Sequence, residues 1–353
     1  MADSYVTKSQ ADRMRKTGME WEAALFFELY YALVEKLNQV EAREILKMAM
    51  YLGREKQTDI LRELVNDHTP LGLAKLWNLL YGTDLNSKRI FALQDDLFII
   101  QGTGCAAFEL FKRWGMPETE IRLIADSFCV SDYGQAKSFN PEIRFRHNSR
   151  LMSGDPVCEW HYSLGTNSIP RRRERIESNE ARVDLVPRTL ASRMLKTGIE
   201  AQGALFLATY QILCEKMTTE DARELLKMSL YQAGRRLGEE FRNLVNEEDV
   251  LGVAKAWSLM YGVDLEGERV VHLSRNLLLL KGGGCPAFEM WKRWGISTDE
   301  MKFLAPAYCA GDLGFVDGFS SKVTLTHTSR LLEGDKSCMY KFEFLGKSVE
   351  RNK

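Results

Sequence analysis

The chain has 353 residues, 45% of them hydrophobic, and a formal net charge of -1, a composition typical of a globular protein with room for two ordinary domains. This net charge gives a nucleic-acid partner no general electrostatic support. The sequence has no run of about 18 apolar residues, so no membrane span is predicted. The first residues lack the apolar core of a signal peptide. We therefore expect a cytoplasmic protein that binds neither nucleic acid nor membrane.

The dominant feature of the sequence is an internal repeat with an offset of 180 residues. The segment ADRMRKTGME at 11–20 returns as ASRMLKTGIE at 191–200, and GTGCAAFELFKRWG at 102–115 returns as GGGCPAFEMWKRWG at 282–295. This period is far too long for a solenoid unit, so each copy is predicted to be a domain. The predicted division is a first repeat domain at 1–164, a linker at 165–190 and a second repeat domain at 191–353.

The segment between the repeats contains two prolines, a basic run and few apolar residues, which is typical of an exposed linker. Two equivalent domains in one chain are predicted to form an intramolecular pseudo-dimer, the counterpart of a two-fold homodimer. Further association of whole chains into a homo-oligomer is left open by the sequence.

The hydrophobic pattern of the first repeat begins as a helical one. Apolar residues at helical spacing predict helices over 18–37 and about 40–66. A third helix is predicted to start at Pro70 and to end near Gly82. The pattern then alternates, which predicts a β-hairpin over 89–101.

The rest of each repeat is predicted to contain both helices and strands. Cys105 opens a helix that ends at Gly115, Pro117 starts another that runs to Cys129, and a second hairpin follows over 143–163. The predicted fold class is therefore α+β: two tandem homologous domains, each with N-terminal helices, a β-hairpin, two helices and a β-hairpin, built on an antiparallel sheet.

Six of the seven cysteines recur at the repeat offset, together with one aspartate and one histidine. Cys105, Cys129, Asp132, His147 and Cys158 match Cys285, Cys309, Asp312, His327 and Cys338. In a reducing compartment such cysteines are expected to be thiols, thiolates or metal ligands rather than disulfides. Strand alternation places His147 and Cys158 on the inner face of the sheet.

A metal centre held by three cysteines is one prediction from this pattern. The ligands would be Cys105, Cys129 and Cys158 in the first repeat and Cys285, Cys309 and Cys338 in the second. If Gly154-Asp155 is a two-residue turn, His147 lies roughly 13 Å from Cys158 along the sheet. That is too far for one zinc ion, whose ligands lie about 2.0–2.3 Å away. The cofactor stays unidentified, with zinc and an iron–sulfur cluster both open.

Catalysis by a thiol is an equal alternative. Cys105 follows a Gly-x-Gly bend at a predicted helix N-terminus, where the helix dipole and free N–H groups stabilise a thiolate. His147 would be the general acid/base and Asp132 would orient it, with Cys285, Asp312 and His327 in the same roles in the second repeat. A third interpretation is that the cysteines only pack as small apolar side chains.

Short motifs of the first repeat form a recognisable set. They are Cys105 near a helix start, Cys129 with Asp132, Asn140-Pro141-Glu142-Ile143, and Gly154-Asp155 followed by Cys158-Glu159-Trp160. This set resembles the L-2-amino-thiazoline-4-carboxylic acid hydrolase-like family, here in tandem duplication. The order of helices and hairpins is also similar to 4-vinyl reductase type small-molecule-binding domains.

The resemblance implies an enzyme that acts on a small molecule and hydrolyses a non-peptide C–N or C–S bond, with cysteine and histidine or with a cysteine-ligated metal. The alternative is a module that binds a metal, an iron–sulfur cluster or a tetrapyrrole-like ligand for sensing, delivery or electron transfer.

Overall fold

The computed structural model describes residues 4–82, 88–165, 185–261 and 269–346. Most of the predicted linker therefore lies outside the described residues. The chain divides into two compact units: unit 1 comprises 1–26 and 33–212, and unit 2 comprises 27–32 and 213–353.

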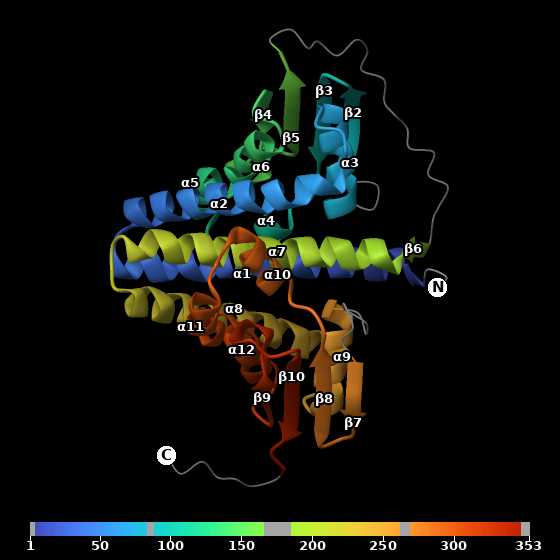
Figure 1. Cartoon of the computed structure of the whole chain (residues 1–353), viewed down its shortest axis with the longest axis vertical. Coiled ribbons are helices and arrows are strands. Elements are labelled where there is room, and N and C mark those ends of the chain that lie inside the picture. Colours follow the sequence, from blue (N-terminus) through green and yellow to red (C-terminus); the bar gives the residue numbers. More distant parts are fainter. Residues whose placement is uncertain (1–3, 83–87, 166–184, 262–268, 347–353) are drawn as a thin grey trace. The chain divides into compact units, whose positions relative to one another are not determined.

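Unit 1 contains the elements of the first repeat (Figure 1). Its helices are α1 (Lys8–Lys36, with residues 27–32 in unit 2), α2 (Gln39–Leu61), α3 (Pro70–Tyr81), α4 (Ala106–Arg113), α5 (Glu118–Cys129) and α6 (Ser131–Phe139). Its sheet is antiparallel and runs in the order β2 (Lys88–Gln94), β3 (Leu97–Gly102), β5 (Cys158–Leu164), β4 (Ile143–Ser149).

Unit 2 repeats this order. Its helices are α8 (Thr219–Val245), α9 (Val250–Tyr261), α10 (Pro286–Trp294), α11 (Thr298–Tyr308) and α12 (Ala310–Phe319). Its antiparallel sheet has the order β7 (Arg269–Leu273), β8 (Leu277–Gly282), β10 (Cys338–Phe344), β9 (Val323–Ser329). The predicted α+β class with two tandem antiparallel sheets is confirmed.

Local sequence signals account for the helix ends. The Asn38 side chain accepts hydrogen bonds from the N–H groups of Val40 and Glu41 and so starts α2. Pro70 occupies the first turn of α3, and Gly82 ends that helix with a φ of 55°, a left-handed conformation that glycine adopts without strain. These ends agree with the sequence prediction.

The core of unit 1 forms where α3 covers the inner face of the sheet. Trp77 makes edge contacts with the rings of Phe98, Trp160 and Tyr162, which project from β3 and β5. Leu73, Leu76 and Leu80 of α3 join the same buried cluster. Aromatic rings in such offset arrangements add to the stabilisation that burial provides.

Several details differ from the prediction. Helix α1 begins at Lys8 rather than at residue 18, and α2 ends at Leu61 rather than near residue 66. Helix α6 was not predicted, because Val130 joins it to α5 in a helical conformation without a capping side chain. The last hairpin is not closed by a two-residue turn: a 3-10 turn at Leu151–Ser153 and a bulge after His147 shift the register, so His147 pairs with Trp160.

The unit boundary does not coincide with the repeat boundary. Helix α7 (Arg188–Cys214) opens the second repeat, yet residues 188–212 belong to unit 1. There Gly198 lies against Gly18 of α1, its counterpart at the repeat offset. Strands β1 (Tyr5–Thr7) and β6 (Leu185–Pro187) also pair with each other. In this pairing the equivalent residues Val6 and Val186 lie opposite one another. Equivalent residues that meet in this way mark a local pseudo-two-fold axis within unit 1.

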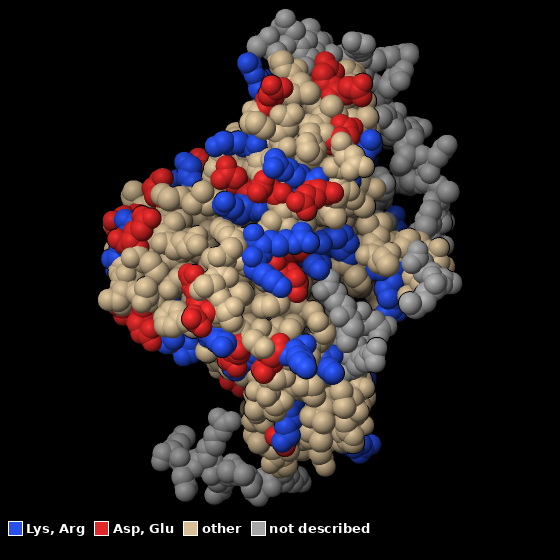
Figure 2. All heavy atoms as spheres, in the orientation of Figure 1, with Lys and Arg blue, Asp and Glu red and all other residues tan. Residues whose placement is uncertain are grey.

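Within the described parts of the chain, no helix combines the length and the apolar character that crossing a membrane requires. Figure 2 shows basic and acidic side chains in neighbouring positions across the face in view.

We predict that Gly198→Ala lowers the free energy of unfolding by about 1–3 kcal/mol, because a Cβ there would overlap the backbone of Gly18. Chemical denaturation would measure the change. The control is Met48→Ala on α2, where the side chain is 51% exposed and we expect a change within about 0.5 kcal/mol. Equal stability of the Gly198 variant and the wild type would contradict the close approach of α1 and α7.

Candidate functional site

An aspartate and a histidine meet in unit 1 where α6 faces the sheet. Asp132 lies in the first turn of α6 and His147 on β4, and Nε2 of His147 is 2.9 Å from Oδ2 of Asp132. The indole N–H of Trp160 on β5 donates to the same oxygen at 2.9 Å. The His147 side chain is only 5% exposed. Two neighbouring strands therefore hold one carboxylate oxygen in place.

The protonation of this pair follows from its contacts. Burial raises the pKa of Asp132, but the hydrogen bond and charge of His147 and the hydrogen bond from Trp160 outweigh it, so the pKa falls below its ordinary value. The carboxylate is therefore an acceptor, and Nε2 of His147 carries the proton. Nδ1 is left with its lone pair, and it is buried without a hydrogen-bond partner among the described residues. A histidine fixed in this tautomer is suited to act as a base at Nδ1.

Unit 2 has the same pair. Nε2 of His327 on β9 is 3.1 Å from Oδ2 of Asp312 on α12, and the His327 side chain is 1% exposed. Its Nδ1 is likewise buried without a partner within the described residues. Tyr340 stands at the position of Trp160, with its ring 5.2 Å from that of His327. The structure thus brings together the histidine and aspartate that the sequence predicted in both repeats.

The six recurring cysteines form no disulfide in the described part of the chain. Cys105 and Cys285 occupy the positions just before α4 and α10, as predicted. Cys129 ends α5, and Cys158 begins β5, where its sulfur accepts a hydrogen bond from the backbone N–H of Leu151 at 3.3 Å.

Burial raises the pKa of three of these thiols. Burial raises the pKa of Cys285 to about 12, although backbone N–H groups at the start of α10 oppose it. Burial also raises the pKa of Cys129 and Cys309 well above the ordinary value, and the nearby charges of Asp132 and Asp312 add to this rise. At Cys285 burial therefore opposes the thiolate that the helix start was predicted to stabilise.

The predicted metal centre has no matching cluster in the described residues. The bulged register places His147 opposite Trp160, two residues from Cys158, so their separation along the sheet is roughly 7 Å rather than 13 Å. Nevertheless, no group of three or more His, Cys, Asp or Glu side chains within the described ranges is arranged to hold a metal ion. The cysteine ligand sets, Cys105, Cys129 and Cys158 with Cys285, Cys309 and Cys338, form no such group there.

A surface cleft lies beside the first pair. It has a volume of about 330 Å³ and is lined by Lys47, Asp126, Val130, Tyr133, His147 and Arg150. Arg150 donates to Asp126 at 2.5 Å, whereas Lys47 forms no ion pair within the described residues. Two cations and one carboxylate leave the cleft with an excess positive charge, which favours an anionic ligand.

The sequence analysis assigned no role to several residues of this site. Trp160 was predicted only as part of a motif, although its position two residues after the inward Cys158 could have placed it on the same face. Lys47 and Arg150 lie more than 100 positions apart in the chain, and only the fold brings them to one cleft.

The pattern of the L-2-amino-thiazoline-4-carboxylic acid hydrolase family matches the chain twice, over residues 18–162 and 198–342. The chain belongs to this family. Membership confirms the resemblance and the tandem duplication that the sequence predicted, and it supports a small-molecule hydrolase as the broad class. Both aspartate–histidine pairs of this family member lie inside the matched segments. No curated protein matches the chain.

We predict a pH-dependent effect of Asp132→Asn on stability. The pKa of Asp132 in the folded state lies below its ordinary value of 3.8, so the ionised carboxylate stabilises the fold above that value. This contribution is lost as the pH falls through the lowered pKa. The variant should therefore be less stable than the wild type at neutral pH, and the difference should shrink below about pH 4.

Denaturant unfolding at a series of pH values would measure this difference. Asp95→Asn in the exposed turn between β2 and β3 serves as the control for the loss of a surface charge. A difference between wild type and Asp132→Asn that stays constant from neutral to acid pH would contradict the assignment.

Proposed function

We propose that the protein hydrolyses a C–N or C–S bond in a small cyclic substrate, with His147 and Asp132 of unit 1 as the general-base pair. The observation that carries the proposal is the hydrogen bond between Asp132 and Nε2 of His147, at the edge of a cleft and within a segment that matches a hydrolase family. An oriented aspartate–histidine pair of this kind activates water in many hydrolytic sites.

The family name gives the substrate class that fits this chemistry, a thiazoline ring that carries an amino group and a carboxylate. A side-chain movement on substrate binding would bring the buried Nδ1 of His147 into the cleft. There Nδ1 would take a proton from water as the water oxygen attacks the ring carbon between nitrogen and sulfur. The bond from that carbon to the ring sulfur or ring nitrogen then breaks, and its electron pair stays on the leaving atom. The proton held by His147 passes to that atom, so one water is consumed and an open-chain product forms.

Asp132 keeps the imidazole in the tautomer that this step requires, and it stabilises the charge that His147 gains when it takes the proton. Trp160 donates to the same carboxylate oxygen and so fixes its position. Cys129 has no role in bond cleavage in this proposal, because burial raises the pKa of its thiol well above the ordinary value.

The carboxylate of such a substrate would bind to Lys47. Its ammonium group lines the cleft and has no ion pair within the described residues, whereas Asp126 already engages Arg150. Arg150 would contribute a second, partly neutralised charge. The anionic end of the substrate would then lie beside His147.

We predict that His147→Ala lowers kcat for hydrolysis of 2-amino-thiazoline-4-carboxylate by about 10²–10⁴-fold, because the base is removed. Asp132→Asn should lower it to a similar extent. The rate would be followed by loss of the ring in liquid chromatography with mass detection. The matched control is His161→Ala, since His161 lies on β5 and bonds to Glu159 and Asn148 away from the pair. A folded His147→Ala enzyme with wild-type kcat would refute the proposed base.

We predict that Lys47→Met raises KM for the same substrate by roughly threefold to tenfold and leaves kcat nearly unchanged, because it removes one exposed charge contact. The carboxamide analogue of the substrate should be processed alike by the variant and the wild type. Lys56→Met, at an exposed position of α2 outside the cleft, is the control. An equal loss on the acid and the amide would argue against carboxylate binding at Lys47.

A further inference from the structure

The two repeats keep the same aspartate–histidine pair but surround it differently. Behind the pair, polar residues of the first repeat correspond to less polar or smaller residues in the second. The positions are Glu22 and Gln202, Arg54 and Gly234, Gln57 and Leu237, Gln135 and Phe315, Trp160 and Tyr340, and Tyr162 and Phe342. Since the fold is the same, the second repeat serves as an internal comparison for the first.

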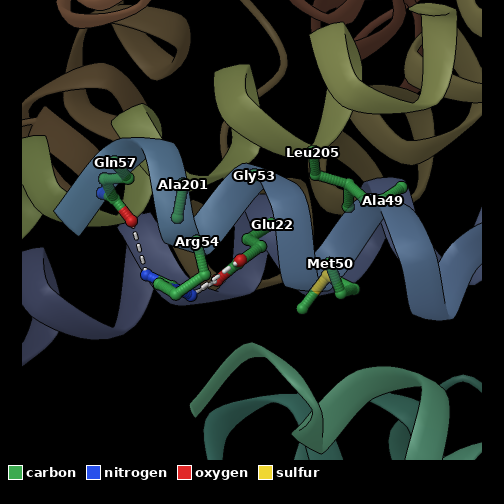
Figure 3. Close-up of a pocket in the computed structure, with 8 residues that line it drawn as sticks. All are labelled: Glu22, Ala49, Met50, Gly53, Arg54, Gln57, Ala201 and Leu205. Carbon is green, nitrogen blue, oxygen red and sulfur yellow. Dashed lines mark hydrogen bonds and ion pairs between the residues drawn. The ribbon is translucent and has the colours of Figure 1, made fainter. Parts of the chain in front are cut away.

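The centre of this polar set is a buried ion pair (Figure 3). The Arg54 guanidinium on α2 donates to both carboxylate oxygens of Glu22 on α1, at 2.8 and 3.0 Å, and the two side chains are 10% and 9% exposed. Its other nitrogen donates to Gln57 at 2.7 Å and to the hydroxyl of Tyr81 at 3.2 Å. Glu22 belongs to α1, Gln57 to α2 itself and Tyr81 to α3, so contacts from three helices hold the guanidinium in one position.

This ion pair is linked through α3 to the helix that carries Asp132, since Arg54 donates to Tyr81 of α3 and Trp77 of α3 donates to Gln135 of α6. Burial raises the pKa of Asp132, and the contacts with His147 and Trp160, together with the positive charge of Arg54, lower it below the ordinary value. Gln135, one turn after Asp132 on α6, accepts a hydrogen bond from the indole of Trp77 at 3.0 Å. Helix α6, which carries Asp132, is thus bound to α3 by a hydrogen bond, and the positive charge of Arg54 on α2 helps to lower the pKa of Asp132.

The fold does not require the ion pair. In unit 2, α8 and α12 approach so closely that a Cβ at Gly234 or Gly238 would overlap the backbone of α12. Gly314 and Gly318 face the backbone of α8 in the same way. The corresponding residues of the first repeat are Arg54, Thr58, Gly134 and Ser138. Of these four only Gly134 is a glycine, and it lies against the backbone of Tyr51 on α2. Burial removes the hydration of both charges, and this cost can offset their attraction, so a buried ion pair is weak evidence of added stability. The presence of the ion pair in unit 1 therefore needs an explanation other than stability.

We propose that hydrolysis is confined to unit 1, and that the Glu22–Arg54 pair is the positioning element that supports Asp132 in its contact with His147. This inference rests on the proposed function. Unit 2 retains Asp312 and His327 as a non-catalytic copy, because the polar network behind them has been replaced by close helix packing.

The first experiment compares His147→Ala with His327→Ala in the full chain, with 2-amino-thiazoline-4-carboxylate as the substrate. The inference predicts a loss of about 10²–10⁴-fold for the first variant and a change of less than about twofold for the second. Comparable losses in the two variants would overturn the confinement to unit 1 and leave the proposed chemistry standing. Full activity in both variants would refute the proposed function itself.

The second experiment tests Arg54 with the double variant Glu22→Gln/Arg54→Met, which removes both charges together. We expect kcat to fall by roughly tenfold to a hundredfold while KM changes by less than about threefold, because Arg54 does not touch the substrate. The single variant Arg54→Lys should recover part of kcat. A folded double variant with wild-type kcat would overturn the positioning role.

The matched control is Glu28→Gln/Arg236→Met, which removes the ion pair between α1 and α8 in unit 2 and should leave kcat unchanged. If the double variant at Glu22 and Arg54 does not fold, Arg54→Lys decides alone. A lower kcat with constant KM and an unchanged melting temperature supports the inference, and an unchanged kcat overturns it.

Discussion

One carboxylate oxygen controls the geometry of the candidate site. Oδ2 of Asp132 accepts from both His147 and Trp160 at 2.9 Å, and these two residues face each other on paired strands. The bulge after His147 and the 3-10 turn at Leu151–Ser153 create this pairing. His147 and Trp160 share this carboxylate. Three features therefore depend on one another: the tautomer of His147, the position of the strand ends, and the packing of α6 on the sheet.

Much of the fold could be predicted from the sequence because its signals are local. The Pro70 and Gly82 ends of α3, the first hairpin and the position of Cys105 before α4 follow from turn and capping chemistry. Helix α6 lacked such a signal, since no side chain caps it at Val130. The hairpin register depended on a bulge, and a shift of one residue changes which side chains meet across the strands.

The candidate site was predicted in part for the same reason. Strand alternation placed His147 on the inner face, and recurrence in both repeats drew attention to Asp132. The sequence could not predict how deeply the thiols are buried, and at Cys285 burial raises the pKa although the residue stands at a helix start. The Glu22–Arg54 pair joins residues of α1 and α2 that are 32 positions apart, so only the fold shows the contact. Its difference from the second repeat, where a glycine takes the place of Arg54, is seen only when the two units are compared.

The candidate site depends on one contact, in which Asp132 holds His147 with the proton on Nε2 and the lone pair on Nδ1. Nitrogen NMR of the full chain with ¹⁵N-labelled histidine, assigned with the His147→Ala variant, reads the tautomer directly. The account predicts that neutral His147 is protonated at Nε2 and loses this preference in Asp132→Asn. A neutral His147 that is protonated at Nδ1 in the wild type would contradict the account, because the atom assigned as the base would already carry a proton.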